Sequence, residues 1–481
     1  MPGGPAQEAQ GFERKEMILQ DSASPSLNKM NELRILSPTG GLGYGFPEGS
    51  LEEGLRRKPH LIGVDAGSTD PGPYYLGAGK PALSWEATER DLELLLKAQQ
   101  KLGIPFIIGS AGLSGSQPGL DRTMDIIKDI ARERGFRFKL ARIGADMDKE
   151  FLKRSLANGK IKTFELAKLL TVEDIDRSER IVSQMGMEPF IEALKMGADV
   201  IVAGRAYDPA VIAALPIMKG FDPGLAIHMG KILECGGMAA EPSAGSDCML
   251  GTIRQDHFLI EPLNKKMRCT VASVSAHTLY EKDNPVKMLL PGGMLDLTET
   301  TFDSISDRVV RVAKTRFVKS SQYTLKLEGA TKVGYRSIFI AGARDPIFIR
   351  EVDNLARIVK ESVERALPYR FGEDYQLLFH IYGKDGVMRE WEPVKDIRSH
   401  ELGMVGEVVG RTQEIAHTIC TYAHGVMLHY PYKGRKSIAG NLAFLYSPSD
   451  FDLGEVFEFN IYHLLEVEDP VSLFPITLED V

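Results

Sequence analysis

Short apolar runs rich in β-branched residues alternate with longer amphipathic segments between residue 33 and about residue 203. Each short run ends in a turn of small residues, and apolar positions in the longer segments recur with a helical period. The expected strands are 33–37, 61–64, 106–108, 138–143 and 199–203, and the expected helices include 86–102, 120–134 and 190–196. This repeat predicts parallel βα units in a sheet covered on both faces. We therefore predict an α/β, Rossmann-like (doubly wound) domain over residues 31–250, with an incomplete barrel of βα units as the alternative.

Beyond residue 250 the apolar runs alternate in polarity more often, which is typical of antiparallel strands with one exposed face. We expect strands at 259–262, 269–274, 309–312, 323–327, 337–340 and 375–382, and helices at 351–367 and 401–424. These elements predict a mixed α+β domain over residues 251–481. Residues 1–30 are rich in Gly, Pro, Gln and Ser, and we expect a disordered leader there.

Composition and charge argue against several classes of protein. The 58 basic residues and 66 acidic residues give a formal net charge of −8, which is unusual for a protein that coats nucleic acid. The four cysteines form no CxxC pair, so neither a zinc ribbon nor a disulfide scaffold is supported. No apolar run reaches the ~20 residues that span a bilayer, and the N-terminus lacks the apolar core of a signal peptide. We expect a cytoplasmic protein with no nucleic-acid or membrane partner.

The first candidate site is the turn after the second expected strand, with sequence DAGSTDPG over residues 65–72. Asp65 and Asp70, together with Ser68, offer a general base or oxygen ligands for a cation. The same residue types also favour tight turns and helix caps, so turn chemistry is an equal alternative. Asp65 is the stronger candidate because it directly follows a buried strand.

Three further expected strands end in polar residues that suit an anion. Ser110 lies in a Gly-Ser turn, whose amides and hydroxyl could cradle a carboxylate or phosphate. Arg142 and Arg205 each lie at a strand end, where a buried guanidinium requires an anionic partner. That partner is either an internal carboxylate, Asp146 or Asp208, or a substrate; a structural ion pair is the more common outcome.

A later segment, AIHMGKILECGGMAAE at residues 226–241, offers a base, an acid or a thiolate. If it is helical as far as Cys235, then His228 and Lys231 share a face with that thiol, and Glu234 lies beside it. His277 is a candidate general acid or base. The alternatives are a small core cysteine and histidines that serve only as hydrogen-bonded structure.

Cofactor motifs are weak. The glycines of 40–45 do not meet the G-x-G-x-x-G spacing, and no Lys follows in the position that a phosphate-binding loop requires. No HExxH or HxH spacing indicates a metal site. The cofactor therefore stays unknown.

Six segments resemble the acyclic terpene utilisation (AtuA) family, over roughly residues 33–445. They include LIGVDAGSTDPGPYYLG (61–77), ADVIVAGRAYDPA (198–210) and HMGKILECGG (228–237). The family's GR-x-x-D element falls here on Arg205 and Asp208, and its ECG element on Glu234 and Cys235. Many relatives carry a C-terminal ferredoxin-like domain with an SGDKG-type motif, which this sequence lacks. The resemblance implies an enzyme of organic-acid or acyl-CoA catabolism that recruits a separate small ferredoxin-like partner chain or manages without one.

Together these patterns predict a lyase of the hydratase type or an isomerase that abstracts a proton beside a carboxylate or thioester. Asp65 or Glu234 would be the base, Arg205 and the 109–112 amides would hold the developing anion, and His277 would be the acid. The alternatives are a non-catalytic scaffold subunit that binds an acid metabolite, and a nucleotide-dependent oxidoreductase. We also expect a homo-oligomer. The enzymatic prediction requires the turns at Asp65, Ser110, Arg142 and Arg205 to meet at one cavity.

Overall fold

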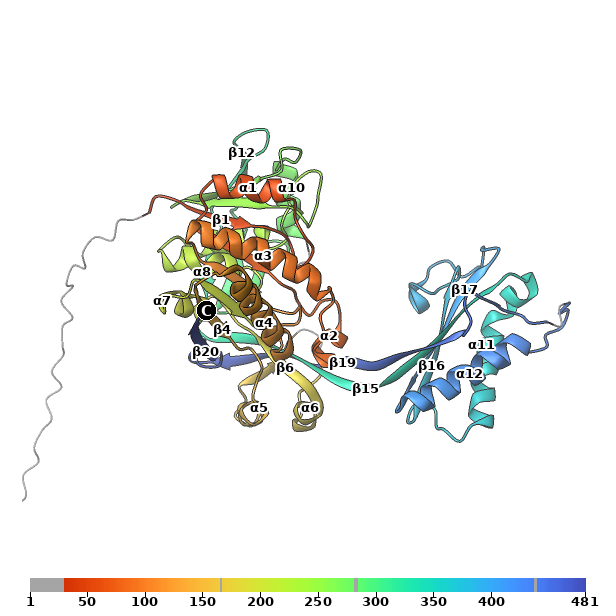
Figure 1. Cartoon of the computed structure of the whole chain (residues 1–481). Coiled ribbons are helices and arrows are strands. Elements are labelled where there is room, and N and C mark those ends of the chain that lie inside the picture. The colour runs from red at the N-terminus through yellow and green to blue at the C-terminus, as the bar shows by residue number, and fades with distance from the viewer. Residues whose placement is uncertain (1–29, 165–166, 281–283, 437–438) are drawn as a thin grey trace, which may run out of the picture. The chain divides into compact units, whose positions relative to one another are not determined.

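Five parallel strands form the centre of a ten-stranded mixed sheet in the computed structural model, which describes residues 30–164, 167–280, 284–436 and 439–481 (Figure 1). In spatial order these strands are β1 (Leu33–Ser37), β2 (Leu61–Asp65), β3 (Phe106–Gly109), β7 (Val200–Ala203) and β4 (Lys139–Ile143). The parallel βα units are therefore confirmed. Apart from Met30, the expected leader lies outside the described residues.

The doubly wound arrangement is not confirmed, because only one side of β1 carries parallel strands. On its other side β1 pairs with β8 (Met249–Ile253), which runs antiparallel to it. The sheet then continues with β9 (His257–Pro262), β13 (Val310–Ala313) and β12 (Thr301–Ser304), and β20 (Ile476–Asp480) pairs antiparallel with β4 at the opposite edge. The expected boundary at residue 250 falls within β8, and the division of the chain into domains stays a prediction.

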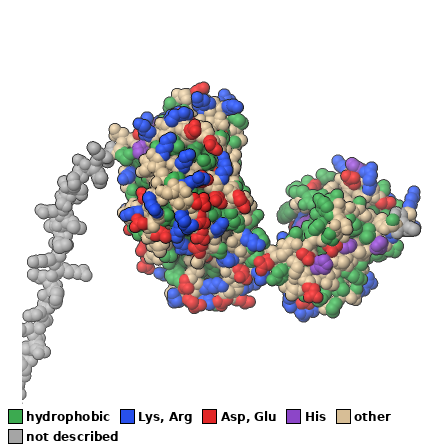
Figure 2. Space-filling view, in the orientation of Figure 1, with side chains coloured by type: hydrophobic (Ala, Val, Ile, Leu, Met, Phe, Trp, Pro, Cys, Tyr) green, Lys and Arg blue, Asp and Glu red, His purple; other side chains and the backbone are tan. Residues whose placement is uncertain are grey.

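Helices cover both faces of this sheet, as the continuous apolar strands require. Successive strand residues such as Ile107 and Ile108 enter two different hydrophobic cores. One core includes α1 (Glu48–Arg56), α3 (Trp85–Leu102) and α4 (Gln117–Arg134), and the other includes α7 (Glu188–Lys195), α8 (Ala210–Met218) and α9 (Pro223–Leu233). On the face that carries α3 and α4, acidic and basic side chains lie next to one another (Figure 2).

Two long strands organise the second sheet. The strand β15 (Tyr323–Ala343) pairs with β19 (Asp450–Val467) along most of its length, so the expected strands 323–327 and 337–340 are parts of one element. The first part of β15 also pairs with β6 (Ser178–Gln184), and its second part pairs with β17 (Leu402–Gly410).

The segment from about residue 335 to residue 459 has the topology of a ferredoxin-like module. Its elements follow the order strand, helix, strand, strand, helix, strand, with α11 (Pro346–Ala366), β16 (Tyr375–Tyr382) and α12 (Gln413–His429) between the long strands. The strands lie in the antiparallel order β16-β17-β15-β19, which is the split βαβ arrangement. Both helices join one separate core with the sheet. This chain therefore contains a module of that topology, and a separate ferredoxin-like partner stays a prediction.

Two expected elements are wrong. Residues 271–274, expected to belong to a strand, form the first turn of the helix α10 (Val271–Leu279). The helix starts there because Thr270 and Ser273 form a reciprocal capping box. The expected helix 401–424 is instead the strand β17 followed by α12, which Thr412 caps. Gly406 suits that strand because a Cβ there would lie 2.1 Å from the ring of Phe339.

Smaller elements complete the described chain. A three-stranded sheet consists of β10 (Lys287–Leu290), β11 (Gly293–Asp296) and β14 (Arg316–Lys319). The remaining elements are α2 (Pro73–Ala78), α5 (Lys149–Ala157), β5 (Ile161–Thr163), α6 (Val172–Arg177), the short 3₁₀ helix η1 (Arg389–Trp391) and β18 (Ala443–Phe444). The helix α3 is capped by Ser84 and ends at Gly103. No helix among the described ranges is both long and apolar enough to cross a bilayer.

Candidate functional site

Three of the four predicted turns meet at one edge of the parallel sheet. Asp65 ends β2, Ser110 follows β3, and Arg205 follows β7; these three strands are neighbours. The Ser110 hydroxyl accepts hydrogen bonds from Arg205 Nη1 at 3.3 Å and from the Ala206 amide at 3.2 Å. Because parallel strands end at the same edge, local strand boundaries are sufficient to bring these residues together.

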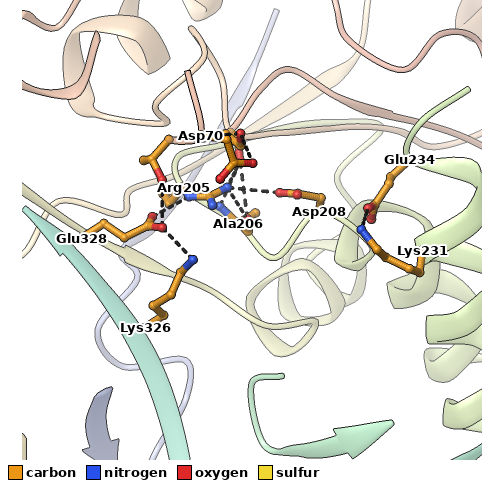
Figure 3. Close-up of polar contacts among 11 residues, drawn as sticks. Asp70, Arg205, Ala206, Asp208, Lys231, Glu234, Lys326 and Glu328 are labelled. Carbon is orange, nitrogen blue, oxygen red and sulfur yellow. Dashed lines mark hydrogen bonds and ion pairs between the residues drawn. The ribbon is translucent and has the colours of Figure 1, made fainter. Parts of the chain in front are cut away.

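Arg205 lies at the centre of a buried ion cluster (Figure 3). Its side chain is 2% exposed; Nε donates to Glu328 Oε2 at 2.7 Å, and Nη1 donates to Asp208 Oδ1 at 3.1 Å. The anionic partners of Arg205 are thus internal carboxylates, which was the structural alternative. A substrate anion would compete with these carboxylates for the guanidinium.

Glu328 joins the two sheets of the molecule through this cluster. It lies on β15 and is fully buried. Its Oε1 atom accepts a hydrogen bond from Thr69 Oγ1 at 2.9 Å and forms an ion pair with Lys326 Nζ at 2.8 Å. Burial by itself would raise the pKa of Glu328, but the charges of Arg205 and Lys326 bring that pKa to about 2. Glu328 is therefore ionised and structural.

Asp65 is the exceptional carboxyl group of the site. It is buried, and its Oδ1 atom has no hydrogen-bond partner among the described residues. Burial raises its pKa well above the ordinary value, and the negative charges of Asp208 and Glu234 raise it further, against the opposing effect of Arg205. This environment favours the protonated carboxyl group, and carboxyl groups perturbed in this direction are candidates for acid–base roles.

A second ion pair lies at the end of α9. Lys231 Nζ contacts Glu234 Oε1 at 2.5 Å, one turn apart on the helix. Burial and the charge of Glu234 raise the pKa of Cys235 to about 12, so this thiol stays protonated at neutral pH. Its sulfur lies 3.8 Å from the Tyr280 hydroxyl. Cys235 is therefore a poor candidate for a thiolate nucleophile.

His277 lies near this second pair rather than at a strand end. It is buried in α10, and its ring is 5.0 Å from the ring of Tyr280, tilted by 30°. Tyr280 therefore contacts both His277 and Cys235. The proposed role of His277 as the acid stays a prediction.

Two of the predicted substrate-binding residues lie in the exposed turn beside the cluster. Ser68 donates a hydrogen bond to Asp70 Oδ2 at 2.8 Å. The charge of Asp70 raises the pKa of Asp208, in addition to the larger effect of burial. These contacts agree with turn chemistry and leave a binding role as a prediction.

The structure does not bring Arg142 to the other three turns. Its guanidinium pairs with Asp121 of α4, at 2.8 Å from Nη2 to Oδ1. Asp146, the expected internal partner, has a pKa raised to about 6 by burial. Three turns therefore converge, and the fourth belongs to a separate surface ion pair.

Sequence reasoning missed the two charged residues that β15 contributes, Lys326 and Glu328. They lie 121 and 123 positions beyond Arg205, and they reach it because β15 pairs with β6, placing Lys326 opposite Gln184 and Glu328 opposite Val182. The only local signal was two charges at alternate positions of an apolar strand, which places both on one face.

A cavity of about 490 Å³ adjoins the cluster, and Tyr207 and Lys326 both line it. Burial raises the pKa of Tyr207, and the charge of Glu234 raises it further, so the phenol is a hydrogen-bond donor at neutral pH. The Tyr207 hydroxyl lies 4.0 Å from the sulfur of Met288. Within the ranges that the structure describes, no group of three or more His, Cys, Asp or Glu side chains could hold a metal ion.

One comparison with known proteins is informative. The family model described as acyclic terpene utilisation family protein AtuA matches residues 78–248 and 254–434. These ranges contain Arg205, Asp208, Glu234 and Glu328, whereas Asp65 precedes them. No curated protein and no solved structure matches the chain.

Proposed function

Because the chain belongs to the acyclic terpene utilisation (AtuA) family, we propose that it is a catabolic enzyme that moves a proton on a small organic acid or acyl-CoA. The reaction class is hydration or dehydration, as in a hydratase, or isomerisation. The family description refers to the utilisation of acyclic terpenes, and the reaction itself is our proposal.

The observation that carries this proposal is Asp65. A buried carboxyl group with a raised pKa and an unpartnered oxygen can accept a proton and return it. The carboxylate form takes a proton from the carbon beside a carbonyl group, which leaves an enolate and a neutral Asp65. Loss of a β-hydroxyl as water then gives an unsaturated acid, and reprotonation elsewhere gives an isomer. Neither route needs an oxidant or a reductant.

The neighbouring groups have separate roles in this proposal. Arg205 keeps a positive charge beside Asp65 and fixes Asp208 and Glu328 by direct ion pairs. Glu234 is the alternative base. The Ser110 and Ala111 amides donate to the Gly204 and Ala203 carbonyl groups at 3.0 Å, which leaves fewer of the 109–112 amides for a developing anion than the sequence predicts. The acid is His277, and Tyr207, which lines the cavity, is a second proton donor.

The test is proton exchange, which does not require knowledge of the product. Purified chain would be incubated in D₂O with unsaturated and hydroxylated acids, free and as CoA esters, and deuterium uptake followed by NMR. We expect Asp65→Asn to lower the exchange rate by about 10²–10⁴-fold, the usual contribution of a positioned acid or base. Asp121→Asn is the matched control, because Asp121 pairs with Arg142 outside the cluster.

Two results would overturn the proposal. One is an Asp65→Asn variant that exchanges at the rate of the unmodified chain. The other is exchange with none of the compounds unless a second small chain is added, which would support the alternative of a scaffold or partner-dependent subunit.

A further inference from the structure

Strands of two different sheets line the cavity beside the ion cluster. Part of its wall comes from the three-stranded sheet, through β10, β11 and β14, and part from β15 and β19. Its apolar lining is contributed by Phe164, Leu289, Leu290, Met294, Val318 and Leu464. A volume of about 490 Å³ is in the usual range for a site that takes a whole small molecule.

The charge of the lining is one-sided. Among the described residues that line the cavity, two are lysines, Lys319 and Lys326, and none is acidic. The adjacent cluster, by contrast, is rich in carboxylates. The two lysines attract an anion, and no described lining residue carries a negative charge that would repel it.

Lys326 is the lysine that the fold holds in place. Its side chain is 19% exposed, and its ammonium group lies 2.8 Å from Glu328 Oε1 and 5.0 Å above the ring centre of Tyr462. Glu328 is shared with Arg205, which takes the other oxygen. An ammonium group has three N–H donors, and Glu328 is its one anionic partner in the described structure, so donors remain for a ligand.

We propose that this cavity binds the substrate as a free aliphatic carboxylic acid, with its carboxylate on Lys326 and its chain against the apolar wall. A thioester carbonyl carries no charge to pair with this lysine, so the free acid is the better fit. Lys326 pairs with Glu328, which also pairs with Arg205, so a carboxylate on Lys326 lies next to the ion cluster. That this ligand is the substrate rests on the proposed function. That the cavity binds an aliphatic carboxylate does not depend on it.

The test is calorimetric titration with octanoate and with uncharged octanamide as probes. We expect octanoate to bind the full chain, and Lys326→Met to weaken that binding by about 10-fold or more, the usual effect of losing a charged hydrogen bond. Octanamide should bind the chain and this variant alike. The matched control is Lys332→Met, because Lys332 lies on the same strand but pairs with Glu455 outside the cavity.

A second variant keeps the test decisive if Lys326→Met fails to fold. Val318→Asp places a negative charge on the cavity wall without touching the ion cluster, and it should weaken octanoate about 10-fold while affecting octanamide less. The inference fails if octanoate does not bind the chain, or if these variants bind it as tightly as the unmodified chain does. Asp65→Asn should still bind octanoate while losing proton exchange. If this variant instead exchanges at the full rate and octanoate binding is intact, the proposed function fails and the binding inference stands.

Discussion

The charges around Arg205 are nearly, but not fully, compensated. The cluster and its neighbouring pair contain four carboxylates, Asp65, Asp208, Glu234 and Glu328, and three cations, Arg205, Lys231 and Lys326. Three of the carboxylates pair with a cation at 3.1 Å or less, and Asp65 has no ion pair among the described contacts. A neutral Asp65 balances the remaining charges, which agrees with the direction of its pKa shift.

This protonation state has a measurable consequence for stability. The pKa of Asp65 is higher in the folded chain than in the unfolded chain, where it is about 4. The stabilisation from protonated Asp65 is therefore complete below about pH 4, and it is lost as the pH rises through the folded-state pKa. Asp65→Asn removes that loss. The free energy of unfolding of this variant, relative to the unmodified chain, should therefore increase with pH above 4, as measured by urea unfolding at several pH values. A constant difference would show that Asp65 is ionised throughout.

Removing the charge of Glu328 tests how much the buried ion cluster contributes to the free energy of unfolding. Glu328→Gln leaves Arg205 and Lys326 without their shared anion, and we expect the free energy of unfolding to fall by about 3–5 kcal/mol. Glu455→Gln, at an exposed pair with Lys332, should cost less than about 1 kcal/mol. Urea unfolding measures both, and similar losses in the two variants would contradict a buried network.

Among the structural elements, the turn between β3 and α4 decides where Arg205 lies. Gly115 has a positive φ of 65°, and its carbonyl accepts a hydrogen bond from the Arg205 amide at 3.0 Å. A Cβ on Gly115 would lie 2.2 Å from that amide nitrogen. The turn therefore packs directly on the end of β7, and only glycine suits this position.

This close approach gives a prediction with an internal control. Gly135 has nearly the same φ, 67°, but no atom lies within 4 Å of the Cβ position. Gly135→Ala should therefore cost only the left-handed strain of about 1–2 kcal/mol. Gly115→Ala should cost about 1–3 kcal/mol more, because the backbone must move, and should also lower the exchange rate. Equal losses in thermal unfolding would contradict the contact.

For the whole molecule, the separate cores are the main feature. The ferredoxin-like module has its own core, formed by α11, α12 and one sheet face, apart from the two cores of the ten-stranded sheet. Large apolar side chains of this module are also exposed, including Val387, Trp391 and Leu445, and Figure 2 shows apolar patches on it. The expected homo-oligomer and the small partner chain stay predictions.

Two matched variants test whether these cores unfold separately. Leu355→Ala removes a buried leucine of α11, and Leu95→Ala removes one of α3; each should cost about 2–5 kcal/mol. Hydrogen exchange followed by mass spectrometry should show lost protection within 335–459 for Leu355→Ala, and within β1–β4 and their helices for Leu95→Ala. Loss of protection over the entire chain in either variant would show one cooperative unit.

Local patterns predicted the parallel strands well and other elements poorly. The strands at 33–37 and 106–108 were recognisable because strands buried on both faces are short, continuous apolar runs. The β-branched run after Thr270 forms a helix because a capping box starts it, and a glycine-rich segment forms β17 because Gly406 admits the ring of Phe339. In both cases a side-chain contact outweighed the propensity of the segment.

The sequence alone determined that Asp65, Ser110 and Arg205 lie together, because each follows a strand whose pattern is readable locally, and neighbouring parallel strands end at one edge. Only the tertiary structure decided their partners. The pairing of β15 with β6 brings Glu328 and Lys326 to Arg205 from more than 120 residues away, while Arg142 turns to Asp121 of α4. Periodicity records which face of an element is buried, but ion pairing depends on side chains that meet only after distant strands have paired.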